Sequence, residues 1–596
     1  MQFGVRWKAG CGSRASASEM NSRRRLAWAI AVAAAVLFTG RILALLYADH
    51  AWYDALGAAP LWREKANDLI VVHVVSAAFS FLFALVNIYA IRRSIVSLAF
   101  PRRLGNVEFG EEVPERALDL AAFVLSAAVA VAMSLAVPSW QTLAALRTAP
   151  RFGESDPFFQ MDLSFYTGWV PLETAVYVWA LTLLVLVSAL VIGLYALTPS
   201  LRWQGRAFHV SVRVRRHLSV LACLFLLSMA WSYRLDGYEL LVNGSGPGGM
   251  FSYVDHQWML PAYLSLAIGT VAAAALVLVS GWMGQVRAGF FTVSAVLIFS
   301  VALDLVLPSV VRRLAGTSTP TAHERPYAAT REAFTRRAYN LARNDSAAPR
   351  EVTRFDSFAD SAKVARVMTL ARDSALVYPG AVGAALVRGV KQVAAPPLGS
   401  GLRRLANAWA EQRLDLVWNS QPDGSHIARR RDVRQRISAL LPVFAQGSRV
   451  VPAYLGDTLT WVLELYSASS TYPLSRHFTL AGQERTYFRH SGTALINAMT
   501  GKVIIVPAPS PDPIAAAWRK HFPENIRAGA PDILDELTAT PRPALNPAMP
   551  IASGTDSAFR ANVTRFYLRM RGALAAGDLK AFGIAYDSLG MTIGSR

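Results

Sequence analysis

Seven long apolar runs occupy the first half of this 596-residue chain. A bilayer core of about 30 Å needs about 20 apolar residues in a helix, which is close to the length of these runs. They are Leu26–Tyr47, Leu69–Ile91, Ala117–Val137, Pro171–Leu197, Leu218–Tyr233, Trp258–Met283 and Ala288–Val311. With a mean hydropathy of +0.30, the pattern predicts a membrane protein with an all-α bundle of seven transmembrane helices.

The positions of the basic residues predict the orientation of this bundle. The net charge is +20, and arginine-rich segments such as Arg23–Arg25, Arg92–Arg93 and Arg215–Arg216 all fall on one side of the seven runs. Because Lys and Arg beside spans are retained in the cytoplasm, the N-terminus should be cytoplasmic and everything after the seventh run extracytoplasmic. The charge therefore indicates a multi-pass inner-membrane protein rather than a nucleic-acid partner.

Three segments follow from these patterns. Residues 1–25 should be a cytoplasmic segment, residues 26–313 the transmembrane domain and residues 314–596 an extracytoplasmic α+β domain. Apolar residues recur at helical spacing over 325–441 and again over 512–596, whereas 450–507 alternates with the period of strands. Thr500–Gly501 is the expected turn of a hairpin in this β-rich part.

Motifs for known chemistry are missing from the sequence. Gly501–Lys502 lacks the other residues of a phosphate-binding loop, and zinc-protease and nucleophile-elbow patterns do not occur. The two cysteines, Cys11 and Cys223, cannot build a disulfide framework or a multi-cysteine metal site. The sequence therefore assigns no catalytic residue, no cofactor and no metal.

Ionisable residues within the apolar runs are candidates for function, because such residues usually need a partner inside a membrane protein. Arg41 lies deep in the first run, and Asp304 lies about two turns from the outer end of the seventh. A structural contact across the bundle or with a loop is one interpretation. An ion or substrate pathway is the other.

Two further groups of polar residues stand out on the outer side. Carboxylates and imidazoles from separate outer segments could converge on a divalent metal, or could cap and orient these loops. This outer-face polar cluster comprises Asp49, His50, Asp156, Asp162, Asp255 and His256. A basic patch of the outer domain comprises Arg429, Arg430, Arg431 and Arg434. A solvated helix face explains this patch, and docking on anionic lipid or envelope polymer is the functional alternative.

Several segments carry a resemblance to a known family. They include Asp156–Phe159, Asp162–Tyr166, Ser252–His256, Glu324–Tyr327, Tyr487–Ser491 and Asp512–Ile514. The chain resembles the uncharacterised protein family 0182 of bacterial membrane proteins, over most of its length. That resemblance implies seven spans and a large extracytoplasmic domain, and it implies no activity. This sequence is shorter than typical members, and its outer region between the helical part and the strands looks abbreviated.

Two hypotheses of function result. The first is a non-enzymatic inner-membrane protein whose outer domain binds or organises envelope components, with the lipid bilayer, envelope proteins or anionic lipids as partners. The second is a transporter or membrane-embedded enzyme that uses Arg41 and Asp304. The oligomeric state is left open by the sequence.

Overall fold

The computed structural model describes most of the chain. The described residues are 13–95, 103–104, 107–108, 115–137, 139–147, 151–196, 201–204, 207–306, 310, 320–342, 348–352, 355, 367–369, 371–372, 374–418, 424–510, 512–519, 532–538, 556–576 and 578–594. All structural statements below refer to these residues.

Seven of the described helices are long and apolar enough to cross a membrane. They are α1 (Ser13–Ala55), α2 (Ala59–Ile95), α3 (Glu115–Leu135), α5 (Val170–Ala196), α6 (Val212–Glu239), α7 (Leu260–Met283) and α8 (Val286–Leu305). Each overlaps one of the seven apolar runs, so the prediction of seven long apolar helices is confirmed. Their apolar side chains are largely exposed, as expected of helices that are hydrophobic all round.

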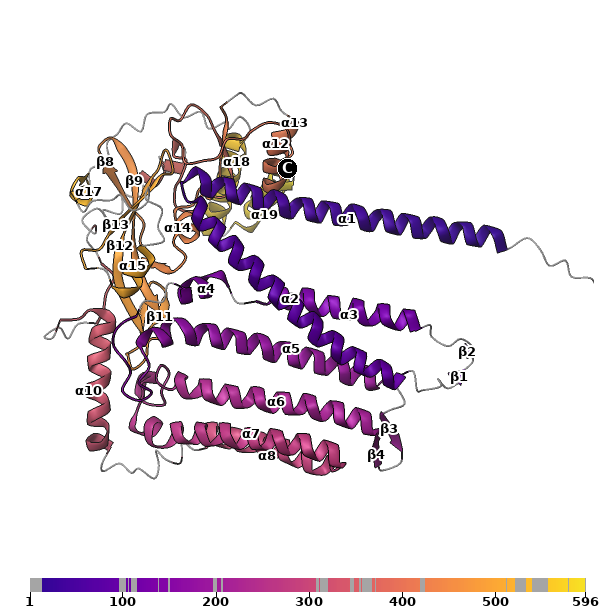
Figure 1. The fold of residues 1–596 in the computed structure, drawn as a ribbon. Coiled ribbons are helices and arrows are strands. Elements are labelled where there is room, and N and C mark those ends of the chain that lie inside the picture. The colour runs from indigo at the N-terminus through magenta and orange to yellow at the C-terminus, as the bar shows by residue number, and fades with distance from the viewer. Residues whose placement is uncertain are drawn as a thin grey trace, which may run out of the picture.

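Six of these helices lie side by side, and α1 diverges from them (Figure 1). The short hairpins β1–β2 (Arg103–Leu104, Val107–Glu108) and β3–β4 (Leu201–Gln204, Ala207–Val210) lie at the end of the row opposite the C-terminal region. A chain of hydrogen bonds links three helices, because His217 of α6 bonds Asn87 of α2 and Tyr195 of α5, each at 2.9 Å. The row is thus held by polar contacts as well as by packing.

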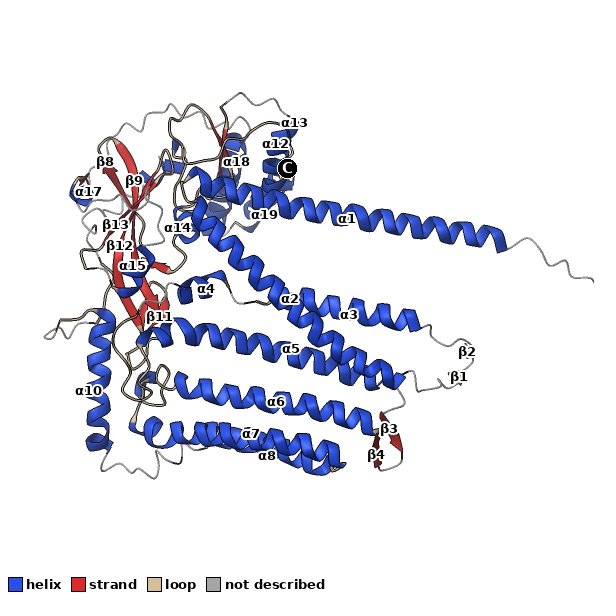
Figure 2. Cartoon of the chain, viewed as in Figure 1, coloured by secondary structure: helices blue, strands red, loops and turns tan. Residues whose placement is uncertain are grey.

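The C-terminal region is built around a six-stranded antiparallel sheet (Figure 2). Its order is β13–β12–β9–β8–β14, and β7 also pairs with β9. The strands are β7 (Phe444–Gln446), β8 (Val451–Leu455), β9 (Thr458–Ser469), β12 (Tyr487–Asn497), β13 (Val503–Pro507) and β14 (Leu537–Thr538). The expected hairpin forms between β12 and β13, and Gly501 in its turn has a φ of 71°. A region with β-sheet after the apolar helices is therefore confirmed.

Shorter elements surround the sheet. The helices are α4 (Trp140–Arg147), α10 (Pro320–Tyr339), α12 (Gly401–Glu411), α13 (Asp415–Trp418), α14 (Val433–Leu440), α15 (Pro513–Trp518), α17 (Asp532–Asp535), α18 (Asp556–Ala575) and α19 (Leu579–Gly594). Two small hairpins are β5–β6 (Ala385–Val387, His426–Ala428) and β10–β11 (Phe478–Leu480, Gln483–Arg485). The stretch 325–441 thus contains strands as well as helices.

Alternation along β9 divides the core between the two faces of the sheet. Trp461, Leu463 and Leu465 point to one face, and Val462 points to the other, because successive strand residues face opposite sides. The first face meets α14 and, from the other end of the sequence, the turn between α1 and α2. This turn with its flanking residues, Asp49–Leu61, is called the α1–α2 tip below. The core of the C-terminal region is therefore completed by the N-terminal helices.

Candidate functional site

The α1–α2 tip is inserted into the core of the C-terminal region. Trp52 and Tyr53 are both 0% exposed, although they lie at the end of a long apolar helix. Gly57 adopts a φ of 69°, and the Gly57 and Ala58 amides donate to the Asp54 and Tyr53 carbonyls at 2.8 Å, which closes a tight turn. The Tyr53 hydroxyl donates to the Ala439 carbonyl of α14 at 2.8 Å. The tip is thus bound to the C-terminal region by apolar and polar contacts.

An arginine-rich segment faces this tip. Residues 429–431 precede α14, whose first turn is capped by Asp432, since its carboxylate accepts from the Gln435 amide at 3.0 Å. The same carboxylate accepts from the Gly380 amide at 2.7 Å, which fixes the neighbouring loop. Local capping therefore positions consecutive arginines beside α1.

Arg430 joins the two parts of the chain directly. Its guanidinium forms an ion pair with Asp49 of α1, and its Cζ lies 4.3 Å from the ring centroid of Trp52 and 5.4 Å from that of Tyr53. A guanidinium over aromatic faces is attracted by their negative charge, more strongly where water is excluded. Asp49 also accepts from the Trp62 indole at 3.1 Å and pairs with Lys65 at 3.8 Å. This polar network encloses the tip.

Arg436 is the buried centre of the same network. Its side chain is 0% exposed, and its guanidinium donates to the carbonyls of Arg430 at 3.2 Å, Gly501 at 2.9 Å and Arg429 at 3.2 Å. Its Cζ also lies 5.5 Å from the Trp52 ring centroid. Burial, with the nearby Arg430 charge, lowers the pKa of Arg436 to about 9, so the side chain stays charged at neutral pH. Arg436 therefore brings a buried positive charge to the α1–α2 tip.

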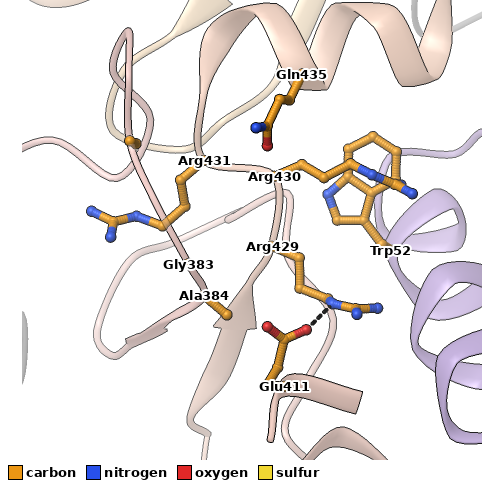
Figure 3. Close-up of a pocket in the computed structure, with 9 residues that line it drawn as sticks. Trp52, Gly383, Ala384, Glu411, Arg429, Arg430, Arg431 and Gln435 are labelled. Carbon is orange, nitrogen blue, oxygen red and sulfur yellow. Dashed lines mark hydrogen bonds and ion pairs between the residues drawn. The ribbon is translucent and has the colours of Figure 1, made fainter. Parts of the chain in front are cut away.

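A pocket of about 210 Å³ opens beside these arginines (Figure 3). Arg429 is bound to Glu411, Arg430 lies along Trp52, and Arg431 extends to the other side of the loop. The lining residues are Trp52, Ala381, Gly383, Ala384, Glu411, Arg429, Arg430, Arg431 and Gln435. Three arginines against one glutamate give the pocket a positive balance. Nη1 of Arg430 is buried and has no hydrogen-bond partner among the described residues.

The four arginines of the predicted basic patch therefore lie in different environments. Arg431 is only 7% exposed and donates to the Leu376 carbonyl at 2.9 Å, while Arg429 and Arg430 are partly buried in ion pairs. Arg434 lies outside the pocket lining and donates to the Ser448 carbonyl at 2.7 Å. Arg429, Arg430 and Arg431 do not form a solvated helix face. They precede α14 and pack against the α1–α2 tip or the adjoining loops.

The predicted outer-face cluster is distributed over separate loops. Asp156 is buried and accepts from the amides of Phe158, Phe159 and Met161 and from the Tyr166 hydroxyl, at 2.6–3.0 Å. Each of these bonds closes the loop before α5.

Asp162 and Asp255 act in the same way. Asp162 accepts from the amides of Phe152, Gly153 and Ser164. Asp255 is buried and accepts from the Ser245 amide and from both the amide and hydroxyl of Ser252.

The two histidines of the cluster also have contacts. His256 bonds the Tyr327 hydroxyl at 2.8 Å, and His50 stands edge-on to the Trp62 ring at 4.6 Å. Asp49 faces Arg430 instead of the other carboxylates. In the described part of the chain, no three His, Cys, Asp or Glu side chains are grouped so that they could hold a metal ion. The arrangement is that of loop capping.

Arg41 and Asp304 are not brought together. The Arg41 guanidinium donates to the Trp409 carbonyl and, at 3.1 Å, to the Ala410 carbonyl, both at the end of α12. Asp304 belongs to α8, and its side chain lies outside the described part of the structure. Figure 1 shows α1 and α8 at opposite sides of the row of helices.

Sequence reasoning missed three residues of this site. Trp52 and Tyr53 fall in the tail of an apolar helix, and Arg436 falls in a basic segment, so neither pattern signals a shared core. The available signal was the segment Asp49–Asp54 after the first apolar run, in which two aspartates flank a histidine and two adjacent aromatic residues.

Comparisons with known proteins agree with the resemblance noted from the sequence. A UPF0182 protein of Desulforamulus reducens is 27% identical over 314 residues, covering 50% of this chain and 34% of the relative. One of Geobacter sulfurreducens is 28% identical over 334 residues, covering 54% of this chain and 36% of the relative. One of Clavibacter sepedonicus is 22% identical over 648 residues, covering 87% and 66%.

The matched part of this chain thus spans about a third of the length of the first two relatives. No solved structure matches the chain. The profile of the uncharacterised protein family UPF0182 matches residues 26–370 and 390–539, which is most of the sequence. The chain therefore belongs to the UPF0182 family.

Proposed function

We propose that this chain is a non-enzymatic, multi-pass protein of the bacterial plasma membrane whose C-terminal region lies outside the cytoplasm and binds anionic envelope components. The seven apolar helices support membrane insertion, and the arginine-rich segments between them support a cytoplasmic N-terminus. In this arrangement the first two helices deliver the α1–α2 tip to the outer surface, where it holds the C-terminal region.

The pocket beside Arg429–Arg431 carries the binding part of the proposal. An arginine presents several N–H donors in a plane that matches a phosphate or carboxylate group. The excess of guanidinium groups in the lining, three arginines against Glu411, is the single observation that points most directly to an anion. Glu411, paired with Arg429, limits the excess positive charge.

Transport through Arg41 and Asp304 has less support. The Arg41 guanidinium is already engaged by two carbonyls of α12.

The binding test uses the full-length protein in detergent, with sn-glycerol 3-phosphate as the probe and glycerol as the uncharged control. Titration calorimetry should detect glycerol 3-phosphate and not glycerol, and Arg429→Ala should weaken binding at least tenfold. Arg434→Ala is the matched control, because Arg434 neighbours the pocket without lining it. Absence of binding, or equal losses in both variants, would refute the anion site. Release of phosphate from the probe would refute the non-enzymatic assignment.

A further inference from the structure

The helices α12 and α13 expose an unusual number of large apolar side chains for a region outside the membrane. Leu402 is 84% exposed, Leu405 42%, Leu414 65% and Trp418 79%. Leu402, Leu405 and Trp409 recur at the i, i+3, i+7 spacing of one helix face, and the opposite side of α12 contains the buried Asn407 and Ala408. One side of this unit therefore packs on protein, and another is apolar and uncovered.

This apolar side is continuous with the surface of α1. Ala44 and Ala48 of α1 form a small core with Ala410, and Trp409 covers Gly40. A Cβ at Gly40 would lie 2.5 Å from the Trp409 ring, so only glycine permits this approach. Arg41 donates to the last carbonyls of α12, which satisfies groups that a helix leaves unpaired at its C-terminus. The unit is thus fixed to α1 along Gly40–Ala48, short of the end of the helix at Ala55.

The length of α1 sets the depth of that contact. The apolar run Leu26–Tyr47 is about 33 Å long at about 1.5 Å per residue, close to the ~30 Å of a bilayer core. If Arg41 lay beyond the core, Leu26–Gly40 would provide only about 22 Å, which is too short. Arg41 therefore lies inside the outer part of the apolar layer, about 9 Å below Tyr47. Figure 1 shows α12 beside α1 and away from its Ala55 end.

We propose that α12 and α13 form an interfacial unit that inserts into the outer leaflet of the membrane beside α1, with Leu402, Leu405, Leu414 and Trp418 against lipid. Interfacial helices bury an apolar face about 5–10 Å into the boundary between headgroups and acyl chains, which matches the depth of Arg41. Lipid is the occupant because neighbouring side chains of α1 are also exposed, with Leu43 at 61% and Leu46 at 47%. Arg403, on the exposed part of α12, can extend its guanidinium to lipid phosphates. This inference depends on the proposed membrane placement, but not on the anion pocket.

The test measures depth by nitroxide labelling of the full-length protein in nanodiscs of phosphatidylcholine and phosphatidylglycerol. Single cysteines replace Leu402 and Trp418 in a Cys11→Ser, Cys223→Ser background, and both positions are exposed enough to leave packing intact. Leu43→Cys on α1 is the lipid control, and Asp457→Cys in the turn between β8 and β9 is the aqueous control. Power saturation then compares collision with oxygen, which concentrates in lipid, and with a nickel chelate, which stays in water.

The labels at 402 and 418 should follow the label at 43, with high oxygen and low nickel collision rates. If they follow the label at 457, the unit faces water and the inference fails while the membrane placement of α1 stands. If the label at 43 is itself accessible to nickel, the membrane placement fails and this inference fails with it. If the labels at 402 and 418 are shielded from both reagents, protein covers the surface, as a second copy or a partner would, and lipid is refuted.

Discussion

Replacement of Trp52 by alanine should release the α1–α2 tip from the C-terminal region. Trp52 is 0% exposed, and its ring contacts the guanidiniums of Arg430 and Arg436. Burying a Trp side chain contributes about 3–5 kcal/mol relative to alanine. The cation–π contacts of the ring are part of this loss rather than an addition to it. We therefore expect the tip to lose about 4 kcal/mol of local stability, which corresponds to a roughly 1,000-fold rise in the open population.

Hydrogen exchange with mass spectrometry on the full-length protein in detergent measures this loss. Peptides covering α14 and the β12–β13 turn should lose protection in Trp52→Ala, because α14 packs against the tip and its Arg436 donates to the Gly501 carbonyl in that turn. Peptides from α6 and α7 should be unchanged. Trp28→Ala is the matched control, since Trp28 lies on the same helix and is 72% exposed. Equal exchange in the two variants, or a uniform loss across all peptides, would refute the insertion of Trp52 as the source of stability.

Two other substitutions test the polar contacts. Asp255→Ala should leave the amides of Ser252 and Ser245 without an acceptor, which costs about 1–3 kcal/mol for each buried donor. Hydrogen exchange should then be faster in the loop before α7. The same change at exposed Asp54 should have no such effect. Glu173→Ala should loosen α5 from α6 by about 1–3 kcal/mol, because the Trp231 indole, which donates to Glu173 at 2.9 Å, loses its acceptor, while the half-exposed Arg234 can turn to solvent. The melting temperature should fall from wild type to Glu173→Gln and further to Glu173→Ala. Equal melting temperatures of the two variants would contradict an acceptor role for Glu173.

Sequence patterns were sufficient where a structure repeats one physical property over many residues. Hydropathy placed all seven apolar helices, because each needs only a long stretch of apolar side chains. Alternation placed β9 and the β12–β13 hairpin, since one strand face is buried against each core. Hydropathy and alternation can both be recognised without knowing which segment packs against the helix or strand.

The site depends on contacts between distant segments, which the sequence does not specify. Arg430 and Asp49 are separated by 381 positions, and Arg41 and Trp409 by 368. The sequence predicted a basic patch at Arg429–Arg431, because local composition cannot distinguish a solvated arginine from one that pairs with a carboxylate of a distant segment. Likewise, the sequence left metal binding and loop capping both open for Asp156 and Asp255, because it does not show the amides that donate to them.

The insertion of the α1–α2 tip has a consequence for the order of folding. Asp49–Leu61 leaves the ribosome long before α14 and the sheet that bury it have been synthesised. Domains generally fold as units in the order of synthesis, but the C-terminal core cannot close until its earliest and latest parts meet. Trp52 and Tyr53 must therefore remain uncovered by their final partners through most of translation. Chains interrupted before residue 441 would leave these aromatic side chains without their final partners, a state that chaperones and proteases recognise.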